Sequence, residues 1–465
     1  MKEFDEKQNS KNIEKKLQSN LSKDEIIRKA FQYHSQGNIA EASKYYQFFI
    51  NQGFKDHRIF LNSGEILKDL GRLEEAEIWM RRAILLKPDY AIAHNNLGNI
   101  LRAKNKLKEA ESCYCKAIIL KPDFIKAYYN LSTITSTDEN KIWQTKLFSE
   151  SFLTNKSEKD KFIIFFARAN ILHKKKNYKE SAKCLKLANQ LKILIRPSNS
   201  ASLIKKSQLL VNEPRKANLN LKKGKNYPQS IFIVGMPRSG TTLTESIISI
   251  NSQVFDLGEV NAFERSFKEW KKNKEKVDLV DLYLQRINKK IKSNITTNKW
   301  LYNYQYAGII STEIPNSKII HCYRNPLDNI LSIYRANFPN GNEYTSSLVD
   351  CAHIYLDQKR VMNEYKKRFR ENIYDLDYEL LVKNPDKEIK RLINWLGWKW
   401  KKSYLKPHLN KRSVITASDV QVRSKINSKS IGGWKNYKEM LQPAIDILAQ
   451  DEEYKTFISD KLHKF

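Results

Sequence analysis

The sequence predicts two domains: an N-terminal all-α solenoid of helical repeats and a C-terminal α/β domain with a mostly parallel sheet. Three observations lead to this prediction. Small residues and prolines recur every 34 residues in the first part of the chain. Later, a β-branched apolar run passes through a glycine loop into a helical pattern at 231–248, and a second apolar run enters a helix at 318–332. Strands that alternate with helices in this way are typical of parallel sheets.

Composition limits the class of protein further. The 465 residues give room for two or three domains, and the net charge is +32. Lysines are spread over the whole length among Asp and Glu, which favours a solvated basic surface over a nucleic-acid site and leaves attraction of acidic substrates open. Five scattered cysteines do not form a disulfide framework. No long apolar run or secretory segment is visible, so we expect a cytoplasmic protein without a membrane span.

The chain divides at changes of pattern. Residues 1–22 are a polar lead-in, 23–195 hold helical repeats, 196–228 form a linker rich in Pro, Ser and Lys, and 229–465 form the α/β domain. The 34-residue spacing joins Ala42, Ala76 and Ala110; Gly37 and Gly71; Gly64 and Gly98; Ala83 and Ala117; Pro88 and Pro122; and Leu97 and Leu131.

The repeats resemble the tetratricopeptide repeat (TPR), which has this period. The best copies are 57–90 and 91–124, with a degenerate copy at 24–56 and a further helix pair at 162–191. TPR arrays form a concave groove that suits extended peptides, so the resemblance implies a peptide or protein partner. Asn95, Asn96 and Asn130 are candidates to clamp a peptide, or equally to join helices. TPR arrays can also pair with themselves, which leaves a homodimer open.

The loop between Gly235 and Thr242 is the clearest chemical signal. A strand, a glycine loop and a helix N-terminus direct unpaired N–H groups at one anion. Gly235 and Gly240 bracket four residues, as in the phosphate loop of ATP-binding enzymes, but Thr241 replaces the lysine that reaches the β- and γ-phosphates. Arg238 enters the loop instead. The pattern therefore favours an anion shorter than a triphosphate.

This loop resembles the 5′-phosphosulfate loop of sulfotransferases, which use 3′-phosphoadenosine 5′-phosphosulfate (PAPS). The resemblance implies an α/β sulfotransferase domain of phosphate-loop type and PAPS as cofactor, without a metal ion. The residues that it assigns to the cofactor are Pro237, Arg238, Ser239, Gly240, Thr241 and Thr242.

Two charged residues, one acidic and one basic, match the catalytic pattern of tyrosylprotein sulfotransferases and their TPR-linked bacterial relatives. In those enzymes a Gly-Glu pair at this distance supplies the general base, which implies Glu259 here. Desolvation can raise the pKa of such a carboxylate toward neutrality. Residues 298–303 resemble the family's D-K-x-P-x-N segment, so Lys299 aligns with the lysine that steadies the transferring group. Asn298 and Leu301 depart from that pattern, which puts the shape of the loop in doubt.

The second anchor is the strand–helix junction at 318–332. Asn325 suits an N-cap, Pro326 suits the first helical position, and Asp328 falls where a capping box places its acid. By resemblance, Arg324 and Ser332 hold the 3′-phosphate that separates PAPS from ATP. An arginine fork can bind two phosphate oxygens at once.

Three later segments complete the resemblance. Tyr378, in a segment like Y-E-x-L-V, is implied to lie near the nucleotide. Ser418, in a segment like T-A-S-x-x-Q-V-R, is implied to donate to the sulfuryl group. Residues 428–437 resemble S-S-x-G-[RK]-W-x-x-Y, but Gly433 stands where a basic residue is usual, which puts the grip on the 5′-phosphate in doubt. Lys429 or Lys435 are candidates to replace that charge.

The sequence therefore predicts a PAPS-dependent transfer of a sulfuryl group to an acceptor hydroxyl. A tyrosine in an acidic protein segment is one candidate acceptor, and a saccharide or a small hydroxyl metabolite are others. Two different classes remain open: a kinase-like phosphate-loop enzyme that uses ATP, and a non-catalytic TPR adaptor with a decayed enzyme domain. The departures at Asn298, Leu301 and Gly433 favour the adaptor, whereas Arg238, Glu259, Lys299 and Arg324 oppose it.

Overall fold

A computed structural model describes residues 21–134, 142–213, 227–274, 276–288, 293–410, 412, 416 and 419–455. Residues 1–20 of the predicted lead-in lie outside this range. The chain folds into two compact units, with the helices up to residue 134 in the first and the elements from residue 150 onward in the second. The two units are described in turn.

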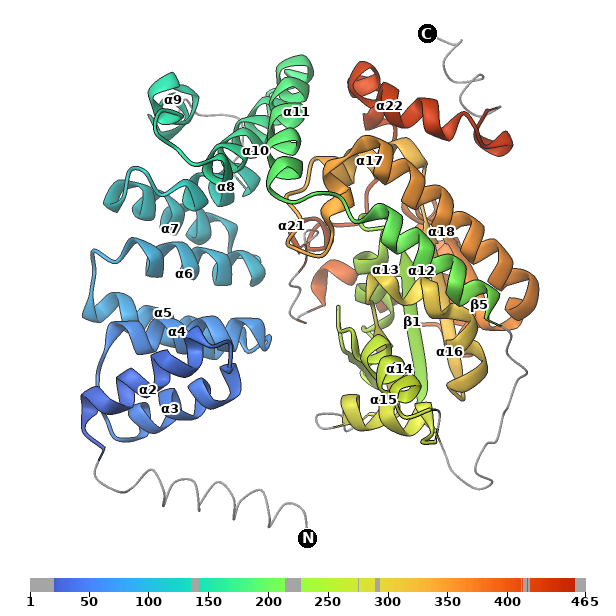
Figure 1. Ribbon diagram of the computed structural model, residues 1–465, viewed down its shortest axis with the longest axis horizontal. Helices are drawn as coiled ribbons and strands as arrows, with labels where there is room; N and C mark the ends of the chain where they lie inside the picture. Colours follow the sequence, from blue (N-terminus) through green and yellow to red (C-terminus); the bar gives the residue numbers. More distant parts are fainter. Residues whose placement is uncertain are drawn as a thin grey trace. The chain divides into compact units, whose positions relative to one another are not determined.

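The first unit consists of α-helices joined in antiparallel pairs (Figure 1). Its helices are α2 (Lys23–Ser35), α3 (Ile39–Asn51), α4 (His57–Asp69), α5 (Leu73–Leu86), α6 (Ala91–Ala103), α7 (Leu107–Leu120) and α8 (Ile125–Ile134). The pairs α4/α5 and α6/α7 correspond to the two best repeats of the sequence. The 34-residue period is therefore the period of one helix pair.

Small residues explain how these pairs pack. Ala76, Ala83, Ala110 and Ala117 are fully buried between helices. A Cβ atom built on Gly98 would lie 2.5 Å from the Tyr114 ring, so α6 and α7 approach more closely than any larger residue allows.

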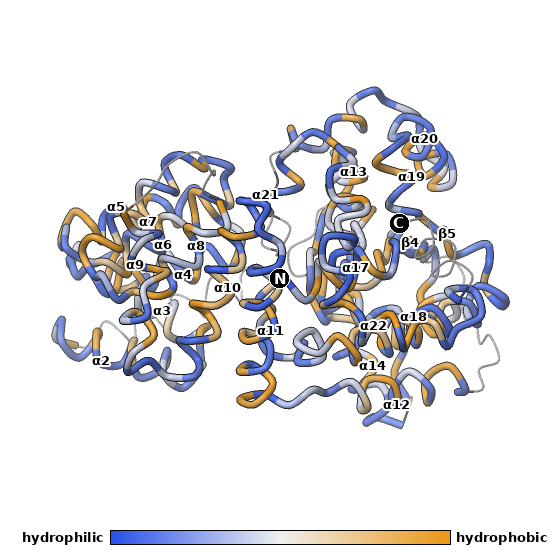
Figure 2. The backbone as a smooth tube through the Cα atoms, turned by 90° about the horizontal axis from the view of Figure 1, so that it is seen from above, coloured by the Kyte–Doolittle hydropathy of each residue, from blue (hydrophilic) through white to orange (hydrophobic). Residues whose placement is uncertain are grey.

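The second unit begins with helices that the sequence assigns to the repeats and to the linker. They are α10 (Glu158–Lys174), α11 (Tyr178–Ile195) and α12 (Ser200–Asn212), after α9 (Ile142–Phe148), which the unit boundary divides. Asn189 of α11 donates to the Tyr334 carbonyl oxygen at 3.0 Å, and Lys192 donates to that of Phe338 at 2.8 Å. The α10/α11 hairpin is thus bound to the α/β part of the chain. In Figure 2 the tube of α11 alternates between hydrophobic and hydrophilic segments, as in a helix with one buried side.

A five-stranded parallel sheet forms the centre of the second unit, which confirms the predicted mostly parallel sheet. Its strand order is β2-β3-β1-β4-β5. The strands are β1 (Gln229–Gly235), β2 (Val254–Asp256), β3 (Ile295–Asn298), β4 (Ser317–Tyr323) and β5 (Ile373–Asp377).

Helices cover both faces of this sheet (Figure 1). On one face lie α14 (Ala262–Lys272), α15 (Leu279–Asn288), α16 (Ala307–Glu313), α18 (Leu348–Phe369) and the 3₁₀ helix η2 (Leu301–Tyr306), together with α12; on the other lie α13 (Thr241–Ile248), α19 (Tyr378–Lys383) and α20 (Pro385–Trp395). The unit also contains α17 (Pro326–Tyr334), α21 (Asp419–Val422), α22 (Lys438–Leu448) and the 3₁₀ helix η7 (Gly433–Tyr437).

Alternation along β1 explains the two layers. Phe232 and Val234 point into a core formed with α12, α14, α15, α16 and α18. Ile231 and Ile233 point to the opposite face, into a core formed with α13, α19 and α20. Because all strands are parallel, every strand ends at the same edge of the sheet, where Gly235 ends β1 and Arg324 follows β4.

The five cysteines all lie in the described part and are free. Among the described residues, no helix is long and apolar enough to cross a membrane.

Candidate functional site

The loop between β1 and α13 is held in a conformation that few residues adopt. Arg238 has φ +67° and Gly240 has φ +101°. A Cβ atom on Gly235 would lie 2.3 Å from the Cys322 carbonyl oxygen, and one on Gly240 would lie 2.6 Å from the Tyr378 ring. The loop thus packs against β4 on one side and against Tyr378 on the other. Glycines at these positions let the backbone approach its neighbours, or a ligand, more closely than other residues allow.

Arg238 crosses from this loop to two other elements. Its Nε donates to Ser332 Oγ of α17 at 3.1 Å, and its Nη2 donates to Gln421 Oε1 of α21 at 2.6 Å. Two residues that the sequence assigns to opposite ends of the nucleotide, Arg238 and Ser332, are therefore in contact. Gln421 lies within the motif that contains Ser418, but the motif alone assigned it no role. Ser418 itself lies outside the described residues.

Arg324 follows β4 and is almost fully buried. Its Nη1 donates to the Arg238 carbonyl oxygen at 3.2 Å, its Nη2 donates to that of Ser430 at 2.7 Å, and its guanidinium lies 4.7 Å from the centre of the Tyr378 ring. The hydroxyl groups of Tyr378 and Ser430 are 2.9 Å apart. Tyr355 donates to the Arg324 carbonyl oxygen at 2.7 Å and fixes the backbone there. Arg324 thus connects the phosphate loop, the Tyr378 segment and the last motif.

The cap of α17 is predicted in part. Asn325 accepts from the backbone N–H groups of Leu327 and Asp328, and Pro326 opens the helix. The capping-box role of Asp328 is wrong, because Glu379 accepts the hydrogen bond from the Asn325 N–H. Asp328 instead accepts from the N–H groups of Gly432, at 2.6 Å, and Trp434, at 3.0 Å. Asp328 therefore bonds to a segment about a hundred residues further along the chain instead of capping its own helix. These two hydrogen bonds hold the last motif against α17.

A pocket of about 370 Å³ lies at this edge of the sheet. Its volume falls in the range of small-molecule sites. Seven of the nine residues predicted to bind cofactor line it: Arg238, Gly240, Thr241, Thr242, Arg324, Ser332 and Tyr378. Pro237 and Ser239 do not line it. Pro237 accepts a hydrogen bond from Asn329 through its carbonyl oxygen, and Ser239 is buried inside the loop.

The pocket is strongly cationic. Its lining contains the side chains of Arg238, Arg324, Arg335, Lys425 and Lys429. Asp328 is the one carboxylate among the lining residues that the structure describes, and both of its oxygens accept backbone hydrogen bonds. Of the two lysines considered as replacements at position 433, Lys429 lines the pocket together with Gly433, whereas Lys435 is not part of this lining. The arrangement favours an anionic ligand.

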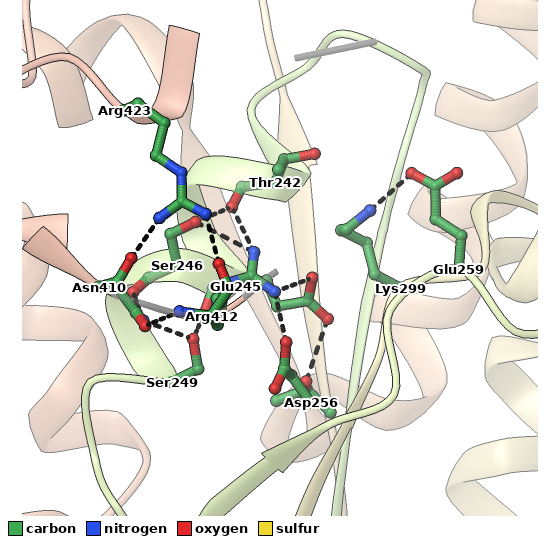
Figure 3. A network of polar contacts seen from close by, with 11 residues as sticks. Thr242, Glu245, Ser246, Ser249, Asp256, Glu259, Lys299, Asn410, Arg412 and Arg423 are labelled. Atoms are coloured by element: carbon green, nitrogen blue, oxygen red, sulfur yellow. Dashed lines mark hydrogen bonds and ion pairs between the residues drawn. The ribbon is translucent and has the colours of Figure 1, made fainter. Parts of the chain in front are cut away.

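Glu259 and Lys299 form an ion pair at the ends of β2 and β3 (Figure 3). Lys299 Nζ lies 2.6 Å from Glu259 Oε1; the lysine is 1% exposed and the glutamate side chain 36% exposed. The backbone N–H of Lys299 donates to the Gly258 carbonyl oxygen at 2.9 Å, which continues the β2–β3 pairing past the strands. The structure therefore brings the predicted base and the predicted cation together, although neither lines the pocket described above.

The departure at Asn298 is accommodated. Its Oδ1 accepts from the Trp300 N–H at 3.1 Å and from Asn303 Nδ2 at 2.9 Å. The aspartate of the related motif could accept both hydrogen bonds in the same way. The backbone next to Lys299 is thus held by an acceptor that both residue types supply.

A buried network around Arg412 is not indicated by any sequence motif (Figure 3). Arg412 Nη1 lies 2.9 Å from Glu245 Oε2 and 2.6 Å from Asp256 Oδ2, and Nη2 donates to Ser246 Oγ at 3.0 Å. Burial raises the pKa of Asp256, although the Arg412 charge opposes this shift. Arg423 donates to the backbone of residues 410 and 412. The network joins α13, the strand before Glu259 and the segment before Ser418. The signal in the sequence was Glu245, the one charged residue of α13.

Metal coordination finds no support in the described residues, where no group of three or more His, Cys, Asp or Glu side chains is placed to hold an ion.

Comparisons with known proteins agree with the two units. Residues 228–402 match the model of the sulfotransferase family, and residues 57–90 and 91–124 each match a tetratricopeptide repeat. An uncharacterized protein of Aquifex aeolicus is 32% identical over 269 residues, which are 52% of this chain and 35% of that protein. A Caenorhabditis briggsae protein, provisionally named a protein-tyrosine sulfotransferase, is 23% identical over 52% of this chain and 97% of its own length.

Solved structures of sulfotransferases are also similar. The sulfotransferase domain of the Synechococcus PCC 7002 olefin synthase has 17% sequence identity and a TM-score of 0.37, with 48% of this chain and 96% of that domain covered. Residues 57–124 of this chain thus match tetratricopeptide repeats, and residues 228–402 match the sulfotransferase family.

Proposed function

We propose that the protein transfers a sulfuryl group from PAPS to an acceptor hydroxyl. The observation that supports this proposal most is the pocket at the ends of β1 and β4. Residues from the phosphate loop, the Arg324 junction and the last motif meet there around a cationic space. Ligands of open α/β sheets bind at this edge.

The residues that line the pocket fit a nucleotide that carries phosphate groups on both its 5′ and its 3′ oxygen. Thr241 and Thr242, at the N-terminus of α13, and Arg238 suit the 5′ end, and Arg324 and Ser332 suit the 3′-phosphate. Arg324 Nε is buried and makes no hydrogen bond in the described part of the chain, although Glu379 Oε1 lies 3.9 Å away as an ion-pair partner, so this N–H can still donate to an anion. PAPS supplies a sulfuryl group joined to a phosphate that leaves as an anion.

The Glu259–Lys299 pair supplies the two functions that the transfer needs. As the acceptor oxygen forms its bond to sulfur, the bond from sulfur to the phosphate oxygen breaks, and the leaving phosphate keeps the electron pair. Glu259 takes the proton of the acceptor hydroxyl. Lys299 stabilises the negative charge that develops on the leaving oxygen, and Ser418 is proposed as a second donor to the same group.

A protein tyrosine is the acceptor class that we favour. The provisional name of the C. briggsae relative points to it, a TPR array suits an extended peptide, and the net charge of +32 favours acidic segments. A saccharide or a small metabolite with a hydroxyl group are the competing acceptors.

The test is transfer of radioactive sulfate from PAPS to three acceptors: an acidic tyrosine peptide, a saccharide and a phenol. Glu259→Gln should lower kcat by about 10²- to 10⁴-fold with little change in PAPS affinity, because general base catalysis is worth that much. Glu439→Gln, which changes an exposed glutamate of α22, is the matched control and should leave kcat unchanged.

Binding separates the rival classes. Calorimetry should give tight binding of adenosine 3′,5′-bisphosphate to the wild type and a collapse of that binding in Arg324→Ala. Preference for ATP with phosphate transfer would establish a kinase instead. Tight bisphosphate binding without transfer to any hydroxyl would favour an adaptor with a decayed enzyme domain.

A further inference from the structure

Arg335 is a cation of the pocket to which the sequence motifs assign no role. It follows α17 directly and lies three residues after Ser332, so the two side chains share one side of the helix. Both line the pocket, together with Leu331 and Asp328. The side of α17 that presents the proposed 3′-phosphate ligand Ser332 therefore presents a guanidinium one turn further on.

Stabilisation of the helix end does not account for this arginine. A cation at a helix C-terminus is favourable because it compensates unpaired carbonyl groups. Here the Tyr334 carbonyl oxygen accepts from Asn189, and that of Phe338 accepts from Lys192. Carbonyl groups at this end are thus already bonded to α11, while Arg335 lines the pocket.

Arg335 also lacks a counter-ion among the described residues. Burial lowers the pKa of Arg335. The neighbours that oppose this shift are the phenolic groups of Tyr437 and Tyr178, and no carboxylate is among them. Asp328, the described carboxylate of the pocket, has both oxygens bonded to backbone N–H groups. A partly buried cation without an anion is unfavourable, and a guanidinium stays charged, so this site gains from an anionic ligand.

The wall beside Arg335 is neutral. Ser181 Oγ donates to the Ala169 carbonyl oxygen and the Tyr437 hydroxyl donates to Ser181, so the Tyr437 oxygen accepts the proton on His173 Nδ1, 2.8 Å away. Burial and the charge of Arg335 lower the pKa of His173 to about 3. The imidazole therefore carries no charge at neutral pH, and it does not compete with Arg335 for an anion.

Position 433 shows which cation this pocket lacks. The resemblance assigns the usual basic residue here to the 5′-phosphate, but Gly433 lines the same pocket as Arg335, and Trp434 next to it donates to Asp328 of α17. Position 433 therefore lies beside the helix that carries Ser332. A Cβ atom on Gly433 would meet nothing closer than Asp328 Oδ1, at 3.8 Å, so the space for a side chain is open. Lys429, the other basic candidate in the lining, is exposed to solvent.

We propose that Arg335 binds the 3′-phosphate of the nucleotide alongside Arg324 and Ser332, and supplies from α17 the charge that position 433 lacks. This inference rests on the proposed use of PAPS. It makes Arg335 a specificity residue, because it recognises the phosphate group that PAPS has and ATP lacks.

The test compares two nucleotides by calorimetry: adenosine 3′,5′-bisphosphate, and adenosine 5′-monophosphate, which lacks the 3′-phosphate. Arg335→Gln should weaken bisphosphate binding about 10- to 100-fold, the range of a lost charged hydrogen bond. Monophosphate binding should change less than about twofold. Lys438→Ala, which changes an exposed lysine of α22 outside the pocket lining, is the control and should change neither affinity.

A rescue variant tests whether a cation at position 433 can replace the cation at position 335. Gly433→Arg in the Arg335→Gln background should restore most of the bisphosphate affinity, and the open space at residue 433 allows this substitution. A double variant as weak as Arg335→Gln would overturn the idea that one position replaces the other.

The remaining outcomes separate this inference from the proposed function. A wild type that prefers the bisphosphate, with an Arg335→Gln variant that keeps the same preference, would overturn the inference and leave the proposed function intact. An equal loss of affinity for both nucleotides in Arg335→Gln would also overturn the inference, because Arg335 would then support the whole site and not the 3′-phosphate in particular. A wild type that does not distinguish the two nucleotides would overturn both.

Discussion

Gly240 carries two separate constraints. Its φ of +101° is strained for any residue with a Cβ atom, and that atom would lie 2.6 Å from the Tyr378 ring. Gly397 has a similar φ of +76° but meets nothing within 4 Å. A substitution at Gly397 therefore tests backbone strain alone, whereas one at Gly240 tests strain together with the contact to Tyr378.

We expect Gly397→Ala to lower the free energy of unfolding by about 1 kcal/mol and to leave nucleotide affinity unchanged, because only the backbone is strained. Gly240→Ala should lower stability by at least as much and should weaken adenosine 3′,5′-bisphosphate binding about tenfold or more, since Tyr378 must move. Urea unfolding and calorimetry on both variants measure this. Equal nucleotide affinity in the two variants would show that the Tyr378 contact is unimportant for binding.

Residues of the site differ in how far the sequence could predict them. The positions of Arg238 and Thr241 in the pocket lining could be predicted, because they follow from a local strand–loop–helix pattern. The positions of Arg335 and Arg412 could not, since their neighbours, such as Gly433 and Glu245, are far away in sequence. Asp328 was assigned to a local cap, and its actual partners lie about a hundred residues further along the chain.

At the scale of elements, the α6/α7 pair depends on the absence of a side chain at Gly98. A Cβ atom there would lie 2.5 Å from the Tyr114 ring, which is fully buried. A Cβ atom on the equivalent Gly64 of the α4/α5 pair would lie 3.0 Å from the flexible end of Met80 and 3.2 Å from the Ala76 carbonyl oxygen. The same repeat position is therefore less crowded in the α4/α5 pair than in the α6/α7 pair.

Gly98→Ala should destabilise its helix pair by about 1–3 kcal/mol, because overpacking outweighs the better helix propensity of alanine. Gly64→Ala should destabilise its pair by less than about 1 kcal/mol, because Met80 can move and alanine favours the helix, while the Ala76 carbonyl oxygen at 3.2 Å must shift by a smaller amount. Hydrogen exchange of the full chain, followed by mass spectrometry on peptides of α4–α7, reports both pairs. Faster exchange in α4/α5 of Gly64→Ala than in α6/α7 of Gly98→Ala would contradict this expectation.

Helix boundaries were easier to predict than helix partners. The 34-residue period indicated the pairs α4/α5 and α6/α7, because each pair repeats the same small residues. For α10 the period was uninformative: Phe162, Ile163, Ile164 and Phe166 are buried on several sides, so no single apolar face shows what the helix packs against. Helix α12 lies within the stretch expected as a linker, where the prolines and serines of its ends masked the pattern.

For the whole molecule, the α10/α11 hairpin belongs to the second unit, together with the sheet. Asn189 and Lys192 bond to backbone carbonyl groups at and after the end of α17, and His173 lines the cationic pocket. The helix α17 also carries Ser332 and precedes Arg335. Removal of the hairpin would leave buried carbonyl groups unpaired and open one wall of the pocket.

Two truncations test this assignment. A chain that starts at residue 144, at the beginning of the second unit, should bind adenosine 3′,5′-bisphosphate within about threefold of the full chain. A chain that starts at residue 200 should lose binding about tenfold or more, because it lacks the hairpin. Calorimetry gives both affinities, and circular dichroism checks that each truncated chain is folded. A folded chain from residue 200 with full affinity would show that the hairpin is dispensable.

The hydrogen bond from Arg238 to Ser332 has a consequence for how the two ends of a ligand communicate. Ser332 Oγ accepts from Arg238 and keeps its own O–H to donate to a group at the 3′ end. An anion that accepts this proton makes the oxygen a better acceptor for Arg238, and so holds Arg238 in place beside the 5′ end. Occupation of one end thus prepares the other, although the two ends touch different elements. For fragments of the nucleotide, the binding free energies would not sum to that of the intact molecule, and the excess would measure the cooperativity built into a single arginine.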